Sequence, residues 1–133
     1  GHDRALVVHG EPGLDELSPI GPSEVVELRD GTLARFRFDP ADRLGWKGFD
    51  PADLAGGDPA DNARIIEDVL TGRRTGAARA AVVLNAAAAL FVADRVESLE
   101  DGVALAERII DGGAAYDALE RLREASRKAA ARA

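Results

Sequence analysis

Residues 9–31 read HGEPGLDELSPIGPSEVVELRDG, and they follow directly on the apolar run of residues 5–8. An unbroken apolar run of this length is typical of a strand that is buried on both faces, usually a parallel strand of an α/β protein. A turn rich in Gly and Pro, residues 11–13, then leads to the adjacent carboxylates of Asp15 and Glu16. Open parallel sheets bind ligands beyond the carboxyl ends of their strands. The stretch therefore predicts an α/β fold that presents two acid groups at the end of a strand.

The strand predicted at residues 5–8 needs neighbouring strands, and nothing before it in this sequence can supply them. We therefore expect its partner strands to belong to sequence outside this chain, and the isolated chain to have an open sheet edge. Further along, residues 24–28 and 33–38 alternate between apolar and polar positions, which indicates two strands. Asp30 and Gly31 favour a tight hairpin turn between them, because this pair readily adopts positive φ angles. The two strands are therefore predicted to be antiparallel.

The middle of the chain predicts a loop followed by a helix. Residues 39–57 are rich in Gly and Pro and indicate a loop, which Trp46 and Phe49 should anchor to the rest of the protein. Asp58 followed by Pro59 is typical of a helix start, because an N-cap carboxylate accepts the free amides and proline suits the first turn.

The later helices differ in their apolar patterns. Residues 77–93 are apolar nearly all round, which predicts a buried helix. Ser98 is placed to cap the next helix. The last helix, residues 114–131, should turn Leu119 and Leu122 inward. The sequence thus predicts an α/β fold with few strands, including a hairpin, followed by about four helices.

The composition is that of one globular domain, since 133 residues lie within the commonest domain size. The net charge of −7 argues against nucleic acid as a partner, because binding a polyanion normally needs a basic surface. Cysteine is absent, which excludes disulfides and thiolate metal sites and fits a cytoplasmic protein. No apolar run is long enough to cross a membrane, and no signal peptide is visible. Because methionine is absent even at position 1, we expect a piece of a longer protein or a tag remnant at the first residues.

Asp15 and Glu16 are the strongest candidates for chemistry. In an extended strand their side chains would point to opposite faces, but the turn that precedes them allows both to converge. Mg²⁺ prefers oxygen ligands and keeps several waters, so one or two carboxylates together with substrate phosphates can hold it. The spacing leaves an alternative open, in which the pair is a solvated acidic turn or a helix N-cap.

Three other polar residues have both a functional and a structural interpretation. His9 could contact a phosphate or exchange a proton, or it could simply bond the backbone at a strand end. Asn62 follows two glycines near a helix start, where free amides can bind anions, or it packs and caps the loop. Asn85 is the only polar residue in the apolar stretch 80–93. Because a buried amide needs partners, we expect Asn85 to bond the backbone of an adjacent loop.

Several short motifs follow one another through the chain. They are Val7-Val8-His9-Gly10, Gly13-Leu14-Asp15-Glu16-Leu17-Ser18, Gly21-Pro22-Ser23, Phe38-Asp39-Pro40, Gly56-Gly57-Asp58 with Asn62-Ala63, and Leu84-Asn85-Ala86-Ala87. In this order and with these gaps, the chain resembles the C-terminal third to half of the anthranilate phosphoribosyltransferase family. Each motif alone is common, and the combination is specific.

The resemblance implies a fold, a reaction and a metal. The family transfers the phosphoribosyl group of phosphoribosyl pyrophosphate (PRPP) to anthranilate in tryptophan biosynthesis, and its fold sets a small helical domain beside a larger α/β domain. Asp15 and Glu16 match the family's Asp-Glu pair, which binds the Mg²⁺ associated with pyrophosphate. No catalytic residue of this segment follows from the resemblance. Residues 1–133 would be the C-terminal portion of the α/β domain, without the helical domain, the glycine-rich pyrophosphate loop or the loop that meets anthranilate.

These implications lead to three expectations. The chain alone should have no transferase activity, and Mg²⁺ binding at Asp15 and Glu16 should be weak without substrate phosphates. The complete enzyme should be a homodimer and this chain a monomer, because the family's dimer contacts lie mainly in the helical domain. Apart from these expectations, one motif differs slightly from the family: residues 20–23 are Ile20-Gly21-Pro22-Ser23, where family members commonly have a run like Thr-Gly-Pro-Thr.

Two alternatives remain open from the sequence. The chain could be a phosphoribosyltransferase-like homologue that binds nucleic acid or protein without transferase activity, although its acidic balance and its Asp15-Glu16 pair argue against that function. It could also be an interaction domain that recruits a partner through its open sheet edge.

Overall fold

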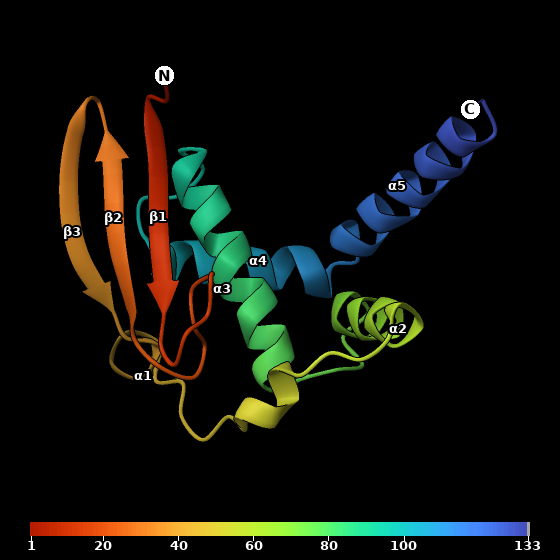
Figure 1. The fold of residues 1–133 in the computed structure, drawn as a ribbon, viewed down its shortest axis with the longest axis horizontal. Coiled ribbons are helices and arrows are strands. Elements are labelled where there is room, and N and C mark those ends of the chain that lie inside the picture. Colours follow the sequence, from red (N-terminus) through yellow and green to blue (C-terminus); the bar gives the residue numbers. More distant parts are fainter. Residues whose placement is uncertain (133) are drawn as a thin grey trace.

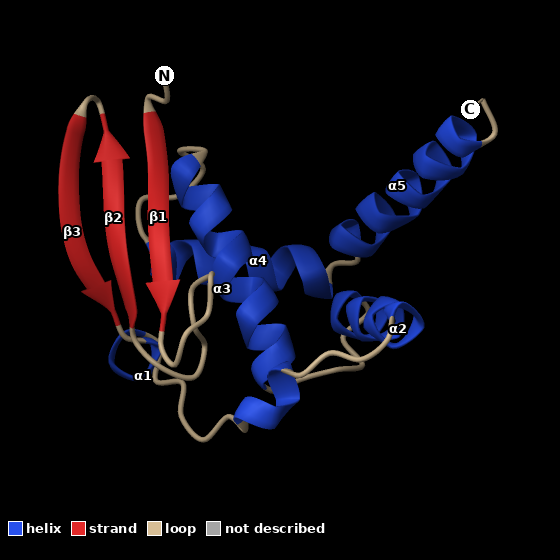
Figure 2. Ribbon diagram, in the orientation of Figure 1, coloured by secondary structure: helices blue, strands red, loops and turns tan. Residues whose placement is uncertain are grey.

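Residues 1–132 are described by a computed structural model, which contains one sheet and a set of helices (Figure 1). The strands are β1 (Arg4–Gly10), β2 (Ser23–Arg29) and β3 (Thr32–Phe38), and all neighbouring strands are antiparallel. The helices are α1 (Pro40–Arg43), the 3-10 helix η1 (Pro51–Leu54), α2 (Pro59–Leu70), α3 (Ala77–Val92), α4 (Leu99–Asp111) and α5 (Ala114–Ala130). Figure 2 shows the strands gathered at one side of the molecule, α3 and α4 beside them, and α2 and α5 at the far side.

The sheet has the order β1-β2-β3, so β1 is an edge strand with one open side. The open edge was expected. One partner strand, β2, nevertheless belongs to this chain and is antiparallel rather than parallel, and the prediction of a strand buried on both faces is wrong. Val7 is 70% exposed, because the helices cover only one face of the sheet. Its neighbour Val8 points to the opposite face and packs against the core, as the alternation of side chains in a strand requires.

The hairpin between β2 and β3 forms where the sequence predicts it. Asp30 and Gly31 adopt φ angles of 49° and 77°, and the register pairs Arg29 with Thr32 on either side of them. Positive φ at both positions matches the right-handed twist of the flanking strands, which is why Asp-Gly suits this turn.

The core lies between the inner face of the sheet and the helices α3 and α4. Helix α3 lies beside β1 and crosses α4 (Figure 1). Gly102 of α4 allows this crossing, because a Cβ atom there would lie 2.9 Å from the carbonyl oxygen of Ala87. The core side chains come from the sheet, the turn after β1 and the helices, and they include Leu17, Val25, Phe38, Val83, Leu84, Phe91, Leu99, Val103 and Ile110.

The helix boundaries follow the capping signals of the sequence. The Asp58 carboxylate accepts the amide of Asp61 at 2.8 Å at the start of α2, and the Ser98 hydroxyl accepts the amide of Asp101 at 3.1 Å at the start of α4. The predicted loop over residues 39–57 contains the short helices α1 and η1, each with an aspartate at its N-cap. In both cases the aspartate precedes a proline, a combination that favours the first turn of a helix.

Two predictions about burial are wrong. Helix α3 is not buried all round, since Val82 is 40% exposed on its outer face. Leu122 is 65% exposed, because α5 projects away from the sheet and contains no buried residue (Figure 1). Among residues 1–132, no helix combines the length and the apolar character needed to cross a membrane.

Candidate functional site at the acidic turn

The acidic turn, residues 11–18, folds back against the end of β1. The amide of Leu14 donates to the carbonyl oxygen of Gly10 at 2.7 Å, and the amide of Gly10 donates to the carbonyl oxygen of Leu14 at 2.9 Å. A Cβ atom at position 10 would lie 2.6 Å from the carbonyl oxygen of Glu16. Glycine is therefore required at position 10 for the turn to approach the strand this closely.

Two side chains from outside the turn, Asn85 of α3 and Ser23 of β2, hold its second half. The amide of Leu17 donates to Oδ1 of Asn85 at 2.9 Å, and Nδ2 of Asn85 donates to the carbonyl oxygen of Leu17 at 3.0 Å. The amide of Ser18 donates to the hydroxyl of Ser23 at 2.9 Å. The predicted role of Asn85, to bond the backbone of an adjacent loop, is confirmed, and the loop that it bonds is the acidic turn.

Asp15 and Glu16 lie between these fixed points, and both are exposed. Glu16 lies at the rim of a hollow of about 260 Å³ that Leu14, Asn62 and Ile65 also line. Partial removal of water at this rim raises the pKa of Glu16, and the negative charge of Asp15 raises it further. The two carboxylates are therefore close enough for their charges to interact.

The donor set fits a hard cation that carries other ligands of its own. Neither Asp15 nor Glu16 forms an ion pair with a cationic side chain among residues 1–132. In the same part of the chain, no three His, Cys, Asp or Glu side chains are grouped so that they could hold a metal ion. Two adjacent, unneutralised carboxylates suit Mg²⁺ only when waters and phosphate oxygens complete its coordination.

Of the other candidates, His9 is exposed near the end of β1 and Asn62 has structural partners. His9 pairs in register with Glu24, and its side chain is exposed. Asn62 accepts the amide of Gly57 at 2.9 Å and donates to the carbonyl oxygen of Gly57 at 3.1 Å. The loop-packing interpretation of Asn62 is therefore confirmed, although the same side chain also lines the hollow beside Glu16.

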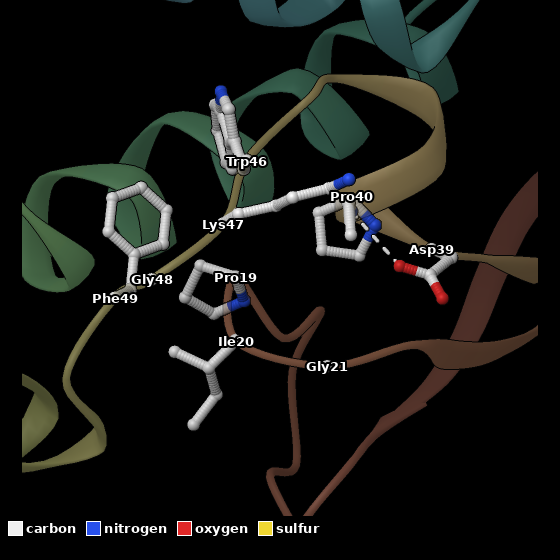
Figure 3. Close-up of a pocket in the computed structure, with 10 residues that line it drawn as sticks. Pro19, Ile20, Gly21, Asp39, Pro40, Trp46, Lys47, Gly48 and Phe49 are labelled. Carbon is white, nitrogen blue, oxygen red and sulfur yellow. Dashed lines mark hydrogen bonds between the residues drawn. The ribbon is translucent and has the colours of Figure 1, made fainter.

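A second hollow of about 250 Å³ lies where residues 19–21, directly after the acidic turn, meet the loop after α1, and sequence reasoning missed it (Figure 3). Pro19 and Ile20 line one side, and Trp46 and Phe49 line the other. The two aromatic rings meet edge to face, with centroids 5.9 Å apart. Two aromatic residues in a glycine-rich loop were the available signal, but only the tertiary structure shows which segment lies opposite them.

Comparison with known proteins gives a consistent result. Residues 1–116 match the family described as "Glycosyl transferase family, a/b domain". Anthranilate phosphoribosyltransferase of Rubrobacter xylanophilus is 46% identical over 132 residues, which are 99% of this chain and 38% of that protein. Anthranilate phosphoribosyltransferase 2 of Streptomyces coelicolor is 51% identical over 95% of this chain and 37% of its own length. The chain thus spans little more than a third of the length of these curated relatives.

Solved structures agree with the sequence relatives. Anthranilate phosphoribosyltransferase from Thermus thermophilus superposes with a TM-score of 0.78 and 39% identity, over 89% of this chain and 34% of that one. The Saccharomyces cerevisiae enzyme in complex with PRPP and Mg superposes with a TM-score of 0.75 and 29% identity, over 86% of this chain and 33% of that one. Another yeast structure is a complex with 4-fluoroanthranilate.

Proposed function

The chain belongs to the glycosyl transferase family through its α/β domain, and from this premise we propose that it is the C-terminal part of an anthranilate phosphoribosyltransferase. The observation that carries the proposal is the identity of 46% to 51% with proteins of that name over at least 95% of this chain. The complete enzyme transfers the phosphoribosyl group of PRPP to anthranilate. The remainder of the enzyme supplies the helical domain, the glycine-rich pyrophosphate loop and the anthranilate-binding loop.

Within that enzyme, the role of this segment is to hold Mg²⁺ beside the pyrophosphate of PRPP through Asp15 and Glu16. The proposal is supported by the adjacent, unneutralised carboxylates at the acidic turn and by the Mg and PRPP in the related yeast structure. Neutralisation of the charge on the departing pyrophosphate is the chemistry that the metal supplies when bound. Asp15 and Glu16 orient the metal and its phosphates at the end of β1.

The metal assignment is tested by titrating the chain with Mg²⁺ and following the resonances of Asp15 and Glu16 by NMR. Both residues should shift, with a dissociation constant of about a millimolar or weaker, because two carboxylates without phosphates make a poor Mg²⁺ site. Resonances that stay in place would contradict the assignment.

The activity is tested by following the loss of anthranilate fluorescence in the presence of PRPP and Mg²⁺. The chain alone should show no turnover. A mixture with a separately produced polypeptide that carries the unmatched part of the Rubrobacter xylanophilus relative should consume anthranilate. Turnover by the purified chain alone would show that the remaining segments are unnecessary. An inactive mixture of folded, associated pieces would favour the homologue that binds without catalysing.

A further inference from the structure

We propose that Asn85 is a positioning residue for the Asp15-Glu16 carboxylates, and this inference rests on the metal-binding role given to them above. Asn85 lies on α3, far along the chain from the acidic turn, yet it bonds both the amide and the carbonyl oxygen of Leu17. Its Nδ2 also donates to the carbonyl oxygen of Ala81 at 3.0 Å, one turn earlier on α3. The third bond fixes the side-chain amide, so that the helix determines where Leu17 lies.

Leu17 transmits this constraint because it follows Glu16 directly. Its side chain is fully buried, while the backbone of Leu14 is bonded to Gly10. Asp15 and Glu16 therefore form a two-residue bend whose ends are both fixed. Loss of Asn85 would leave the amide and carbonyl oxygen of Leu17 without these partners, and this end of the bend would then be held only by the buried Leu17 side chain and by the bond from the Ser18 amide to the Ser23 hydroxyl. Groups that orient metal ligands typically change metal affinity by 10- to 100-fold when they are removed.

Asn85 clamps Leu17 by bonding both its amide and its carbonyl oxygen, and the chain contains a second, matched clamp of this kind. Asn62 on α2 bonds the amide and the carbonyl oxygen of Gly57 in the same two-point manner, at 2.9 and 3.1 Å. This clamp fixes the loop before α2 rather than the acidic turn. Asn62 lines the same hollow as Glu16 but bonds Gly57 and not the acidic turn, so it separates the effect of holding the turn from the general effect of removing a side-chain clamp.

The test is a Mg²⁺ titration, followed by NMR, of the unaltered chain and the variants Asn85→Ala, Asn85→Leu and Asn62→Ala. Asn85→Ala should raise the dissociation constant at Asp15 and Glu16 by about 10-fold, whereas Asn62→Ala should leave it within about twofold. Asn85→Leu keeps the branched shape of the side chain and suits a helix, so it replaces Asn85→Ala if that variant does not fold. Either Asn85 variant should give the same weakening.

Hydrogen exchange of the unaltered chain provides a second readout that requires no substitution. If the clamped turn is the form that binds the metal, saturating Mg²⁺ should slow exchange of the Leu17 amide, because a ligand stabilises the state to which it binds. The Gly57 amide, held by the matched clamp, should exchange at an unchanged rate.

Three results would overturn the inference. The first is equal Mg²⁺ affinity in the unaltered chain and a folded Asn85 variant, with no protection of the Leu17 amide. The second is a loss of affinity in Asn62→Ala as large as that in the Asn85 variants, which would indicate general loosening. In both cases the metal assignment would survive. The third is an unaltered chain whose Asp15 and Glu16 do not respond to Mg²⁺, and this result would overturn both proposals.

Discussion

Glu16 combines partial loss of water with a neighbouring like charge, and both raise the pKa of its carboxyl group. A raised pKa means that the folded chain holds this proton more tightly than the unfolded chain does. The contribution of Glu16 to the free energy of unfolding is therefore most favourable at low pH, and it is lost as the pH rises through the folded pKa. Asp15 and Glu16, which form no ion pair with a cationic side chain among residues 1–132, are suited to binding a cation.

Substituting Asp15 should lower the pKa of Glu16. In Asp15→Asn the like charge is removed but the surroundings of Glu16 are kept, so the pKa should fall toward its ordinary value and stay somewhat above it. The measurement is an NMR titration of the Glu16 side-chain carboxyl. Asp53 lines the same hollow, but the raised pKa of Glu16 comes from burial and from Asp15, so Asp53→Asn is the control and should leave that pKa unchanged. An unaltered Glu16 pKa in Asp15→Asn would show that the two carboxylates do not interact.

For single residues, the sequence predicts those roles that depend only on residues close by along the chain. The caps at Asp58 and Ser98 and the turn at Asp30-Gly31 are each determined within a few residues, and the structure confirms them. The need of Asn85 for backbone partners was also predictable from its apolar surroundings. Its actual partner was not, because Leu17 lies far away in sequence and the two meet only through tertiary packing.

Among the elements, the crossing of α3 and α4 depends on the absence of a side chain at Gly102. A Cβ atom there would lie 2.9 Å from both Cβ and the carbonyl oxygen of Ala87. Helix propensity alone predicts that Gly102→Ala stabilises the protein by about 1 kcal/mol. Because the added methyl group would push the helices apart, we expect a net destabilisation of about 1–3 kcal/mol instead.

Urea unfolding measures the effect of Gly102→Ala. Ser126→Ala, on the exposed surface of α5, is the control, and its free energy of unfolding should change by no more than about 0.5 kcal/mol. A more stable Gly102→Ala variant would mean that the two helices are less closely packed than the structure indicates.

Substitutions of two leucines compare a buried position on the packed helix α3 with an exposed position on the projecting helix α5. Leu84 on α3 is fully buried, so Leu84→Ala should lower the free energy of unfolding by about 2–5 kcal/mol. Leu122 on α5 is 65% exposed, so Leu122→Ala should change it by no more than about 0.5 kcal/mol. Both values come from urea unfolding of the same chain. A large loss in Leu122→Ala would show that α5 packs against a surface in solution.

The elements themselves were largely predictable, whereas their surroundings were not. The apolar run in β1 and the apolar helix α3 both predicted burial on all sides, yet Val7 and Val82 are exposed. Periodicity records which side chains are suited to burial and carries no information on whether a covering element is present. The amphipathic pattern of α5 likewise predicted an inward Leu122, yet this side chain is 65% exposed.

The whole chain presents the Asp15-Glu16 carboxylate pair on a fold that spans little more than a third of the length of its curated relatives. The family and the fold class followed from the order of the motifs, and the comparisons confirm both. The metal role of Asp15 and Glu16 stays a prediction. The second hollow was beyond sequence reasoning, because Pro19 and Trp46 belong to segments that meet only in the folded chain (Figure 3).

The transferase role of this chain and the metal role of Asp15 and Glu16 are tested together by the rate of anthranilate consumption in a chimera in which this chain replaces the matching stretch of the Rubrobacter xylanophilus relative. We predict an active enzyme, with a loss on the order of 100-fold or more in the Asp15→Asn, Glu16→Gln chimera, because the charge on the pyrophosphate would no longer be neutralised. The Asp53→Asn chimera, altered at a carboxylate beside the same hollow, should retain its activity. A folded, PRPP-binding chimera without activity, or one whose rate is unaffected by loss of both acidic-turn carboxylates, would contradict the account.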